Sequence, residues 1–217
     1  MSPQLLRVQN FNVSGDGFGA GDDQTFERPF GHADPRVLMA WCGETASWLM
    51  RSEPGGSRGI DDYLVRDYAR NIGAEIMGRG KFGPQKGAWE DHEWQGWWGD
   101  EPPFHTPVFV MTHHTRPEIT LSDTTFHFVD DDPATVLAQA REAAQGKDVR
   151  LGGGATTIRE FLDADLVDTL HVAVSPGIKL GSGSRLWESP DELRDRFHVD
   201  VVPSPGGSVV HYLAWRK

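Results

Sequence analysis

Three short segments of the sequence carry residue types that could hold a phosphate group. The first is Val-Arg-Leu-Gly-Gly-Gly-Ala-Thr-Thr-Ile at 149–158, where small residues stand at the passage from a strand to a helix. A diphosphate could approach the backbone there and meet the unpaired N–H groups of the first helical turn. The hydroxyl groups of Thr156 and Thr157 could donate further hydrogen bonds. A plain glycine turn between two packed elements is the alternative, because short glycine motifs recur by chance.

The second segment, Gly78-Arg79-Gly80-Lys81-Phe82-Gly83, matches the G-x-G-x-x-G dinucleotide pattern and follows an apolar run. Pro84 soon interrupts any long helix, and no acidic residue ends a second strand at the required distance. We therefore exclude a Rossmann domain. Arg79 and Lys81 beside exposed backbone amides still indicate an anion site, although a surface turn with two basic residues would look the same.

The third segment, Thr112-His113-His114-Thr115-Arg116, follows an apolar run at 107–111. Open α/β sheets bind ligands beyond the carboxyl ends of their strands, and hydroxyl, imidazole and guanidinium groups there suit a phosphate. Two adjacent histidines also suggest a metal. Neighbours at a strand end point to opposite sides, however, and no third ligand follows at suitable spacing, so we expect no metal.

The elements that must position these segments alternate between strands and helices. Apolar runs predict strands, two of which form a C-terminal hairpin around Pro205-Gly206-Gly207. Helical spacing or capping predicts helices, and a glycine-rich loop at 15–21 follows the first strand. Helices between apolar strands imply a largely parallel sheet covered on both faces, in three layers. The predicted strands are 5–13, 74–77, 107–111, 125–129, 149–151, 166–175, 197–202 and 209–215, and the predicted helices are 61–72, 133–145 and 155–162, with 35–50 as a fourth possibility.

Length, charge and cysteine content restrict the class of protein. A chain of 217 residues suits a single domain, 1–217, with a sizeable core. The net charge of −11 repels phosphate backbones, so we expect no nucleic-acid partner. Met1 to Gln9 lacks a signal-peptide pattern and no long apolar run follows, so we expect no membrane association. The single cysteine, Cys42, fits a reducing environment, and we expect a cytoplasmic protein.

Other residue clusters are less informative. Most of the eight tryptophans fall in 41–98, where they could line an apolar ligand pocket, form plain core or make an oligomer contact. No Ser-His-Asp or Cys-His signature and no P-loop stands out, so hydrolase chemistry is not indicated.

Several motifs, in order along the chain, resemble the dihydrofolate-reductase-like family. The pattern is similar to the reductase domain at the C-terminus of the bifunctional riboflavin-biosynthesis deaminase-reductase, standing here alone. The motifs are Ile76-Met77-Gly78-Arg79-x-x-Phe82, Trp97-Trp98-Gly99, Pro102-Pro103-Phe104-His105-x-Pro107-Val108-Phe109-Val110-Met111-Thr112-His113-His114, Asp148-Val149-Arg150-Leu151-Gly152-Gly153-Gly154, Leu166-Val167-Asp168-x-Leu170-His171-x-x-x-Ser175-Pro176 and Gly181-Ser182-Gly183-x-x-Leu186.

The resemblance implies a mixed, mostly parallel eight-stranded sheet, NADPH as hydride donor and a homodimer. It further implies that the Gly152–Gly153 peptide is cis. It places four sets of residues at the cofactor. The pyrophosphate would lie at Gly152, Gly153, Gly154, Ala155 and Thr156, and a second helix start would support the phosphates with Gly78, Arg79, Gly80 and Lys81. The adenosine end would lie at Thr112, His113 and His114, and the flexible loop Ser14-Gly15-Asp16-Gly17-Phe18 would cover the nicotinamide, with Asp16 and Gly17 at the cofactor.

Dihydrofolate reductases use a carboxylic acid on the helix before the Gly-Arg strand, which makes Asp62 the candidate proton donor, with Asp61 and Asp67 as rivals. Lys81 stands where the family has a threonine, and insertions at about 43–60 and 83–105 remodel the substrate side. We therefore expect an NADPH-dependent reductase of a small pterin- or pyrimidine-like heterocycle. A reductase of the riboflavin pathway and a non-catalytic NADP(H)-binding protein remain the alternatives.

Overall fold

The computed structural model describes residues 3–217, whose contacts divide them into two compact units. The first unit comprises the described residues up to Arg7, together with Gln24–Pro29 and Asn71–Asp168, and the second comprises Val8–Asp23, Phe30–Arg70 and Thr169–Lys217. Strand β1 (Leu6–Ser14) begins in the first unit and continues in the second. A single domain over 1–217 remains a prediction.

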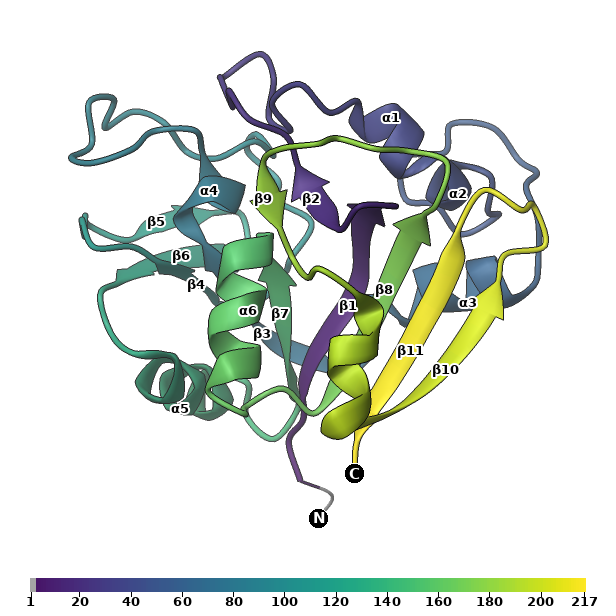
Figure 1. The fold of residues 1–217 in the computed structure, drawn as a ribbon. Coiled ribbons are helices and arrows are strands. Elements are labelled where there is room, and N and C mark those ends of the chain that lie inside the picture. Colours follow the sequence, from purple (N-terminus) through teal and green to yellow (C-terminus); the bar gives the residue numbers. More distant parts are fainter. Residues whose placement is uncertain (1–2) are drawn as a thin grey trace. The chain divides into compact units, whose positions relative to one another are not determined.

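The first unit is built on a mostly parallel sheet (Figure 1). Its strands follow the order β1, β7 (Asp148–Gly153), β3 (Ile72–Gly78), β4 (Val108–Met111), β6 (Thr124–Val129) and β5 (Ile119–Leu121). Only the pairing of β5 with β6 is antiparallel. Most residues of β7, β3 and β4 are buried, which is expected for the strands of a sheet that is covered on both faces.

The helices of the first unit begin at residues that favour a helical start. In α5 (Pro133–Ala143), Asp132 accepts the N–H groups of Ala134 and Thr135, and proline occupies the first turn. Helix α6 (Ala155–Asp163) buries Ile158, Phe161 and Leu162 on one face, because their spacing places them on one side of the helix. It packs along β7, as Figure 1 shows, while α4 (Arg79–Phe82) is a single turn after β3.

The second unit contains the strand order β10 (Phe197–Pro203), β11 (Val210–Arg216), β8 (Thr169–Ser175) and β1. The strands β10 and β11 form the predicted C-terminal hairpin, paired from Phe197↔Arg216 to Pro203↔Val210. A separate small ladder joins β2 (Phe18–Ala20) to β9 (Ser184–Arg185). The helices are α1 (Pro35–Leu38), α2 (Ala40–Gly43), α3 (Ile60–Asp67) and the 3-10 helix η1 (Pro190–Asp195).

The predicted α/β architecture is confirmed, with corrections of detail. The main sheet has nine strands among the described residues rather than eight, because the short strand β5 was not predicted. The region 35–50 forms only the short helices α1 and α2. Strand β8 begins at Thr169 rather than at residue 166.

Three of the four tryptophans of residues 83–105 belong to, or pack against, a core cluster of the first unit. Trp89 is buried together with Phe82, Phe104, Phe126 and Phe128, and Trp94 and Trp98 pack against this cluster. The insertion at 83–105 therefore extends the core of the first unit over α4, which explains why it is rich in aromatic residues.

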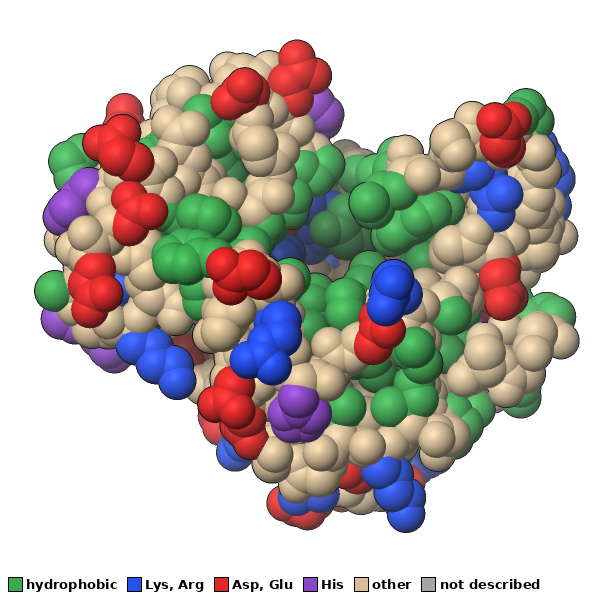
Figure 2. Space-filling model, turned by 90° about the horizontal axis from the view of Figure 1, so that it is seen from above, with side chains coloured by type: hydrophobic (Ala, Val, Ile, Leu, Met, Phe, Trp, Pro, Cys, Tyr) green, Lys and Arg blue, Asp and Glu red, His purple; other side chains and the backbone are tan. Residues whose placement is uncertain are grey.

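The surface is mixed in charge. Acidic and basic side chains are both scattered over the face seen in Figure 2, with hydrophobic patches between them. Among residues 3–217, no helix has both the length and the apolar character needed to cross a bilayer.

Candidate functional site

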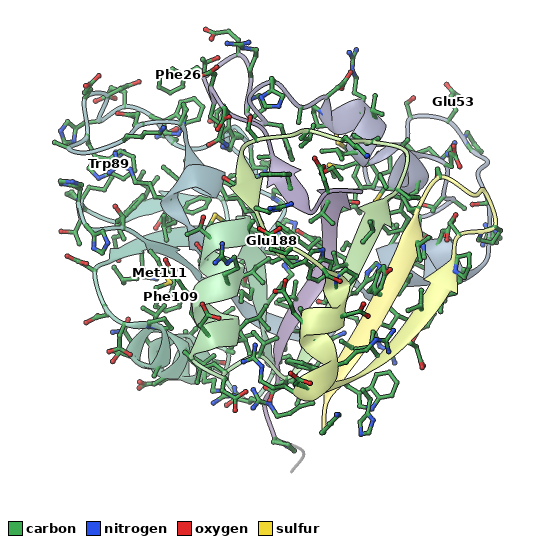
Figure 3. The ribbon with its side chains drawn as sticks, in the orientation of Figure 1. Phe26, Glu53, Trp89, Phe109, Met111 and Glu188 are labelled. Atoms are coloured by element: carbon green, nitrogen blue, oxygen red, sulfur yellow. The ribbon has the colours of Figure 1, made fainter. Side chains whose placement is uncertain are left out.

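The three phosphate-suited segments of the sequence begin at the same edge of the first unit's sheet. Parallel strands β7, β3 and β4 lie side by side, with Met77 opposite Gly153 and Gly78 opposite Met111. The chain therefore leaves these strands at neighbouring points, where ligands of open α/β sheets bind. Met111, labelled in Figure 3, is the last residue of β4.

The glycine turn connects β7 directly to α6. Gly154 precedes the helix and makes no side-chain cap, and the first N–H bonded within the helix is that of Ile158, to the Gly154 carbonyl. The N–H groups of the first turn are thus left for another acceptor. The cis peptide is Gly153–Gly154, one position later than the predicted Gly152–Gly153.

Two of the glycines are needed by packing, and a third leaves space. A Cβ on Gly152 would lie 2.2 Å from Glu75 Oε1 and 2.4 Å from Lys81 Nζ, and one on Gly78 would lie 2.1 Å from the Thr157 hydroxyl. A Cβ on Gly154 would meet no atom within 4 Å. Backbone approach from that side is therefore open to a ligand. Thr156 is exposed at the same turn.

A buried group of three charges lies beneath the turn. Glu75 is opposite Arg150 in the paired strands β3 and β7, and its two carboxylate oxygens bind Arg150 and Lys81, the latter at 2.8 Å. Burial raises the pKa of Glu75, but the charges of Arg150 and Lys81 outweigh burial and hold it below the usual range. Glu75 is therefore ionised, and it fixes the Lys81 ammonium beside Gly152.

Arg79 turns towards the aromatic insertion. Its guanidinium lies 3.8 Å from the centre of the Trp89 ring, and that of Arg116 lies 4.9 Å from the same ring. Burial lowers the pKa of both arginines, and the charge of Arg116 lowers that of Arg79 further. Trp89 lies in the loops beside α4 (Figure 3). The role of Arg79 at a phosphate remains a prediction. Sequence reasoning did not foresee that Trp89 lies against its guanidinium.

The third segment, which begins at Thr112, has both buried and exposed side chains. Thr112 is buried, and its hydroxyl accepts the N–H of His114 at 3.1 Å. His113 and His114 are exposed, and His113 Nδ1 lies 2.8 Å from Asp130 Oδ1. Within residues 3–217 no three His, Cys, Asp or Glu side chains group as a metal site.

The predicted nicotinamide loop, in the second unit, is held by Asp16. Its carboxylate accepts the Ser14 hydroxyl at 2.6 Å and the N–H groups of Leu180 and Gly181 at 3.1 and 2.8 Å. Burial opposes ionisation, but these hydrogen bonds lower the pKa of Asp16 to about 2. Gly17 has φ +87, and a Cβ there would lie 2.3 Å from the Trp187 carbonyl oxygen. Both residues fix the loop, and their contact with a cofactor stays a prediction.

The predicted proton donor Asp62 lies in the first turn of α3. It is buried, accepts the Ser47 N–H at 2.8 Å and pairs with Arg66 at 3.3 Å. Burial raises its pKa, but the hydrogen bonds from Ser47 and the charges of Arg66 and Arg58 lower it more. The surroundings of Asp62 thus favour the carboxylate, and its role as an acid stays a prediction.

The rivals of Asp62 are also bound. Asp61 is buried and accepts hydrogen bonds from Ser204 and His211, and Asp67 accepts one from Gln9 at 3.0 Å. Sequence reasoning missed His211 and named His171 only within a family motif, without a role, because a single histidine in an apolar strand does not stand out. The other signal was the position of each within a predicted strand.

Comparison with known proteins gives the family. The model of the RibD C-terminal domain matches residues 8–200. No curated protein matches the chain.

Solved structures show a similar fold at low sequence identity. A putative riboflavin biosynthesis protein from Shewanella sp. PV-4 is 20% identical, with 100% of this chain and 99% of that chain covered and a TM-score of 0.55. The deaminase/reductase of Thermotoga maritima is 15% identical, with 99% and 57% covered and a TM-score of 0.56. Acinetobacter baumannii RibD is 14% identical, with 99% and 58% covered and a TM-score of 0.54. This chain thus spans just over half the length of the last two.

The predicted α/β fold with a mostly parallel sheet is confirmed by these structures, and the predicted reductase class by the matching family model. The chain belongs to the family of the RibD C-terminal domain and is a reductase.

Proposed function

We propose that this protein is an NADPH-dependent reductase that transfers hydride to a small heterocycle, pterin-like or pyrimidine-like. The observation that carries the proposal is the common edge of β7, β3 and β4. The glycine turn, the turn that carries Lys81 and the segment that starts at Thr112 follow the neighbouring ends of these three strands. Such an edge suits an extended ligand that carries several phosphates.

The residues at this edge fit the phosphates of a dinucleotide. The backbone from Gly152 to Thr156 would hold the pyrophosphate, because α6 begins there without a side-chain cap and the space over Gly154 is open. Lys81 would add a positive charge, which Glu75 holds in place. The segment Thr112–His114 would lie at the adenosine end. When bound, the cofactor supplies the hydride, and the protein binds and orients it.

The test is titration with NADPH, followed by cofactor fluorescence. Saturable binding at submillimolar concentration is expected, and turnover should follow when a reducible heterocycle is added. Absence of saturable binding would remove the proposal. Saturable binding without turnover on any pterin or pyrimidine would instead favour a non-catalytic NADP(H)-binding protein.

A second candidate is the reductase of riboflavin synthesis. The Thermotoga maritima neighbour is described as a diaminohydroxyphosphoribosylaminopyrimidine deaminase and 5-amino-6-(5-phosphoribosylamino)uracil reductase. Under this candidate the chain would reduce the same ribosyl phosphate intermediate. Growth of a riboflavin-requiring strain on expression of this chain would support it, and failure to complement with soluble, NADPH-binding protein would exclude it.

We also propose a homodimer that works in the cytoplasm. The family resemblance supports the dimer, and the buried free thiol of Cys42 fits a reducing compartment. Light scattering on the purified protein gives the mass directly, and a monomer at all concentrations would contradict the dimer.

A further inference from the structure

A line of hydrogen-bonded side chains crosses the interior of the second unit. Asp61 Oδ1 lies 3.0 Å from His211 Nε2, and His211 Nδ1 lies 3.0 Å from His171 Nε2. At the other end, His171 Nδ1 lies 2.7 Å from the amide Oδ1 of Asn10. Asp61, His171 and His211 are buried, whereas Asn10 is half-buried. The line therefore has one accessible end, and that end is an amide.

Asn10 has an unusual backbone for a strand residue. It lies within β1 and has φ +50, the left-handed region that few non-glycine residues adopt. Its N–H donates to His171 Nδ1 at 3.3 Å, and its carbonyl accepts from the Asn12 side chain at 2.9 Å. A strained residue persists only where its surroundings hold it, and such positions cluster at binding sites. Here His171 and Asn12 hold it.

The carboxylate of Asp61 sets the direction of every donor in the line. Asp61 also accepts the Ser204 hydroxyl at 2.7 Å through Oδ2, and a carboxylate can only accept hydrogen bonds. His211 must then donate from Nε2, which leaves its Nδ1 to accept from His171 Nε2. In turn, His171 Nδ1 has no proton and accepts. This order requires both histidines to be neutral.

The surroundings of the histidines favour the neutral forms. Burial, and then the neighbouring His211, lower the pKa of His171 to about 3. Burial also lowers the pKa of His211, against the raising effect of Asp61. The edge of the Trp41 indole covers both rings, at 5.8 and 4.8 Å between centroids. Burial and the charge of Asp61 raise the pKa of the nearby Cys42 to about 12, so its thiol is neutral as well.

The polarity of the line fixes which way the Asn10 amide points. Because His171 Nδ1 accepts, the amide must direct its NH₂ group to it, which a half turn of the side chain achieves; oxygen and nitrogen of an amide exchange places in that turn. The outer amide atom has no partner among residues 3–217 and is not enclosed. Asn10 thus offers a free carbonyl oxygen at the surface of β1, shortly before the loop Ser14–Phe18.

We propose that Asn10 binds the substrate through this oxygen, and that Asp61, acting through His211 and His171, fixes the amide in its accepting direction. Asn10 would therefore select a heterocycle that presents a ring N–H or an amino group at that point. His171 and His211 are positioning residues in this scheme. The inference deepens the proposed reductase function and rests on it.

The first measurement is the tautomeric state of the histidines in the unmodified protein. Nitrogen NMR on ¹⁵N-histidine-labelled protein at pH 7 is expected to show His171 and His211 with protonated Nε2 and unprotonated Nδ1. A protonated Nδ1 on His171 would reverse the direction of the hydrogen bonds along the line and overturn the proposal. This measurement depends on no variant.

The second measurement compares two pyrimidines in the presence of saturating NADPH. The first, 2,4-diaminopyrimidine, has amino donors, whereas 2,4-dimethoxypyrimidine has the same ring without them. The protein is expected to bind the diamino compound at least about tenfold more tightly, since the dimethoxy compound would cover the Asn10 oxygen without giving it a donor. The diamino compound alone should shift the NMR signals of the Asn10 side-chain amide.

Variants then connect the preference to the line. Asn10→Gly keeps the left-handed backbone available and removes the amide, so the preference for the diamino compound should disappear while NADPH affinity stays unchanged. His171→Asn breaks the bond to His211 and should reduce the preference. The control is His198→Asn, at an exposed histidine of β10 in the same unit, which should keep it.

The outcomes separate the two proposals. If the unmodified protein does not bind NADPH, the reductase proposal is removed. Normal NADPH binding with no preference between the pyrimidines, with no binding of either, or with an undiminished preference in Asn10→Gly overturns the role of Asn10 alone. Should Asn10→Gly fail to fold, the tautomers and the Asn10 amide shifts of the unmodified protein decide.

Discussion

Lys81 holds its Nζ 2.8 Å from Oε1 of Glu75, a carboxylate that is itself fully buried. A lysine on a single helical turn would ordinarily move freely, because its side chain has four rotatable bonds. The ion pair instead fixes the ammonium within reach of Gly152. The family resemblance places a threonine at this position, so a fixed cation would take the place of a neutral donor.

Replacement of Lys81 should weaken cofactor binding. We expect Lys81→Met to lose about 1.5–3 kcal/mol of NADPH affinity, roughly tenfold or more, because a charged hydrogen bond to a phosphate is lost. Fluorescence titration measures the dissociation constant. Lys86→Met removes an exposed lysine of the same unit and should leave it unchanged. Equal affinity of Lys81→Met and the unmodified protein would show that Lys81 serves Glu75 alone.

Two glycines of the turn should respond differently to alanine. Gly152→Ala places a Cβ 2.2 Å from Glu75 Oε1, so we expect a loss of about 1–3 kcal/mol in the free energy of unfolding. Gly154→Ala meets nothing within 4 Å and should retain stability while NADPH binds more weakly, because the new methyl group stands where the pyrophosphate would approach. Urea unfolding and NADPH titration measure the two effects.

The control for both is Gly177→Ala, an exposed glycine of the second unit with open space around it. It should change neither quantity. A stable Gly154→Ala protein with full NADPH affinity would place the pyrophosphate elsewhere.

Apolar runs and capping residues predicted the elements that are long enough to show a period. Helix α5 has Asp132 as its cap and proline in its first turn, and the hairpin β10–β11 has two apolar runs around a glycine turn. The strands β2, β5 and β9 have three residues or fewer, too few to show alternation, and pairing with a neighbour determines them.

The side-chain contacts of the second unit were beyond sequence reasoning for a different reason. His211 pairs with Ala173 and Leu213 with His171 in the ladder of β11 and β8. The two histidines therefore stand diagonally on one face, a relation that depends on the register of strands 40 residues apart in the chain.

In the first unit, likewise, Arg79 lies against Trp89 only because of the course of the insertion between them.

The acid stability of the second unit should depend on Asp16. Its pKa is about 2 in the folded protein, below the ordinary value of an aspartate, so its contribution is fully present above about pH 5 and is lost as the pH falls through about 2. We expect Asp16→Asn to lower the free energy of unfolding at pH 7 by about 1 kcal/mol, after allowance for solvent screening. Urea unfolding from pH 2 to pH 7 measures this.

The difference between Asp16→Asn and the unmodified protein should shrink towards zero at the acid end. Asp191→Asn, at an exposed carboxylate of η1 in the same unit, serves as the comparison for a surface aspartate. A difference that stays constant with pH would show that Asp16 stabilises the loop by packing rather than by its charge.

Asp62 tests the chemistry. If it supplies the proton, Asp62→Asn should lower kcat about 100-fold or more and leave the NADPH dissociation constant unchanged. Because Ser47, Arg66 and Arg58 lower its pKa, an acid at this position must be protonated again in each turnover, so kcat should rise as the pH falls. Steady-state kinetics from pH 5 to pH 9 measure this, with Asp67→Asn as the matched variant on the same helix. If kcat of Asp62→Asn equals that of the unmodified protein and does not depend on pH, another group is the proton donor. If only Asp67→Asn shows a large loss of kcat, the proton donor is Asp67.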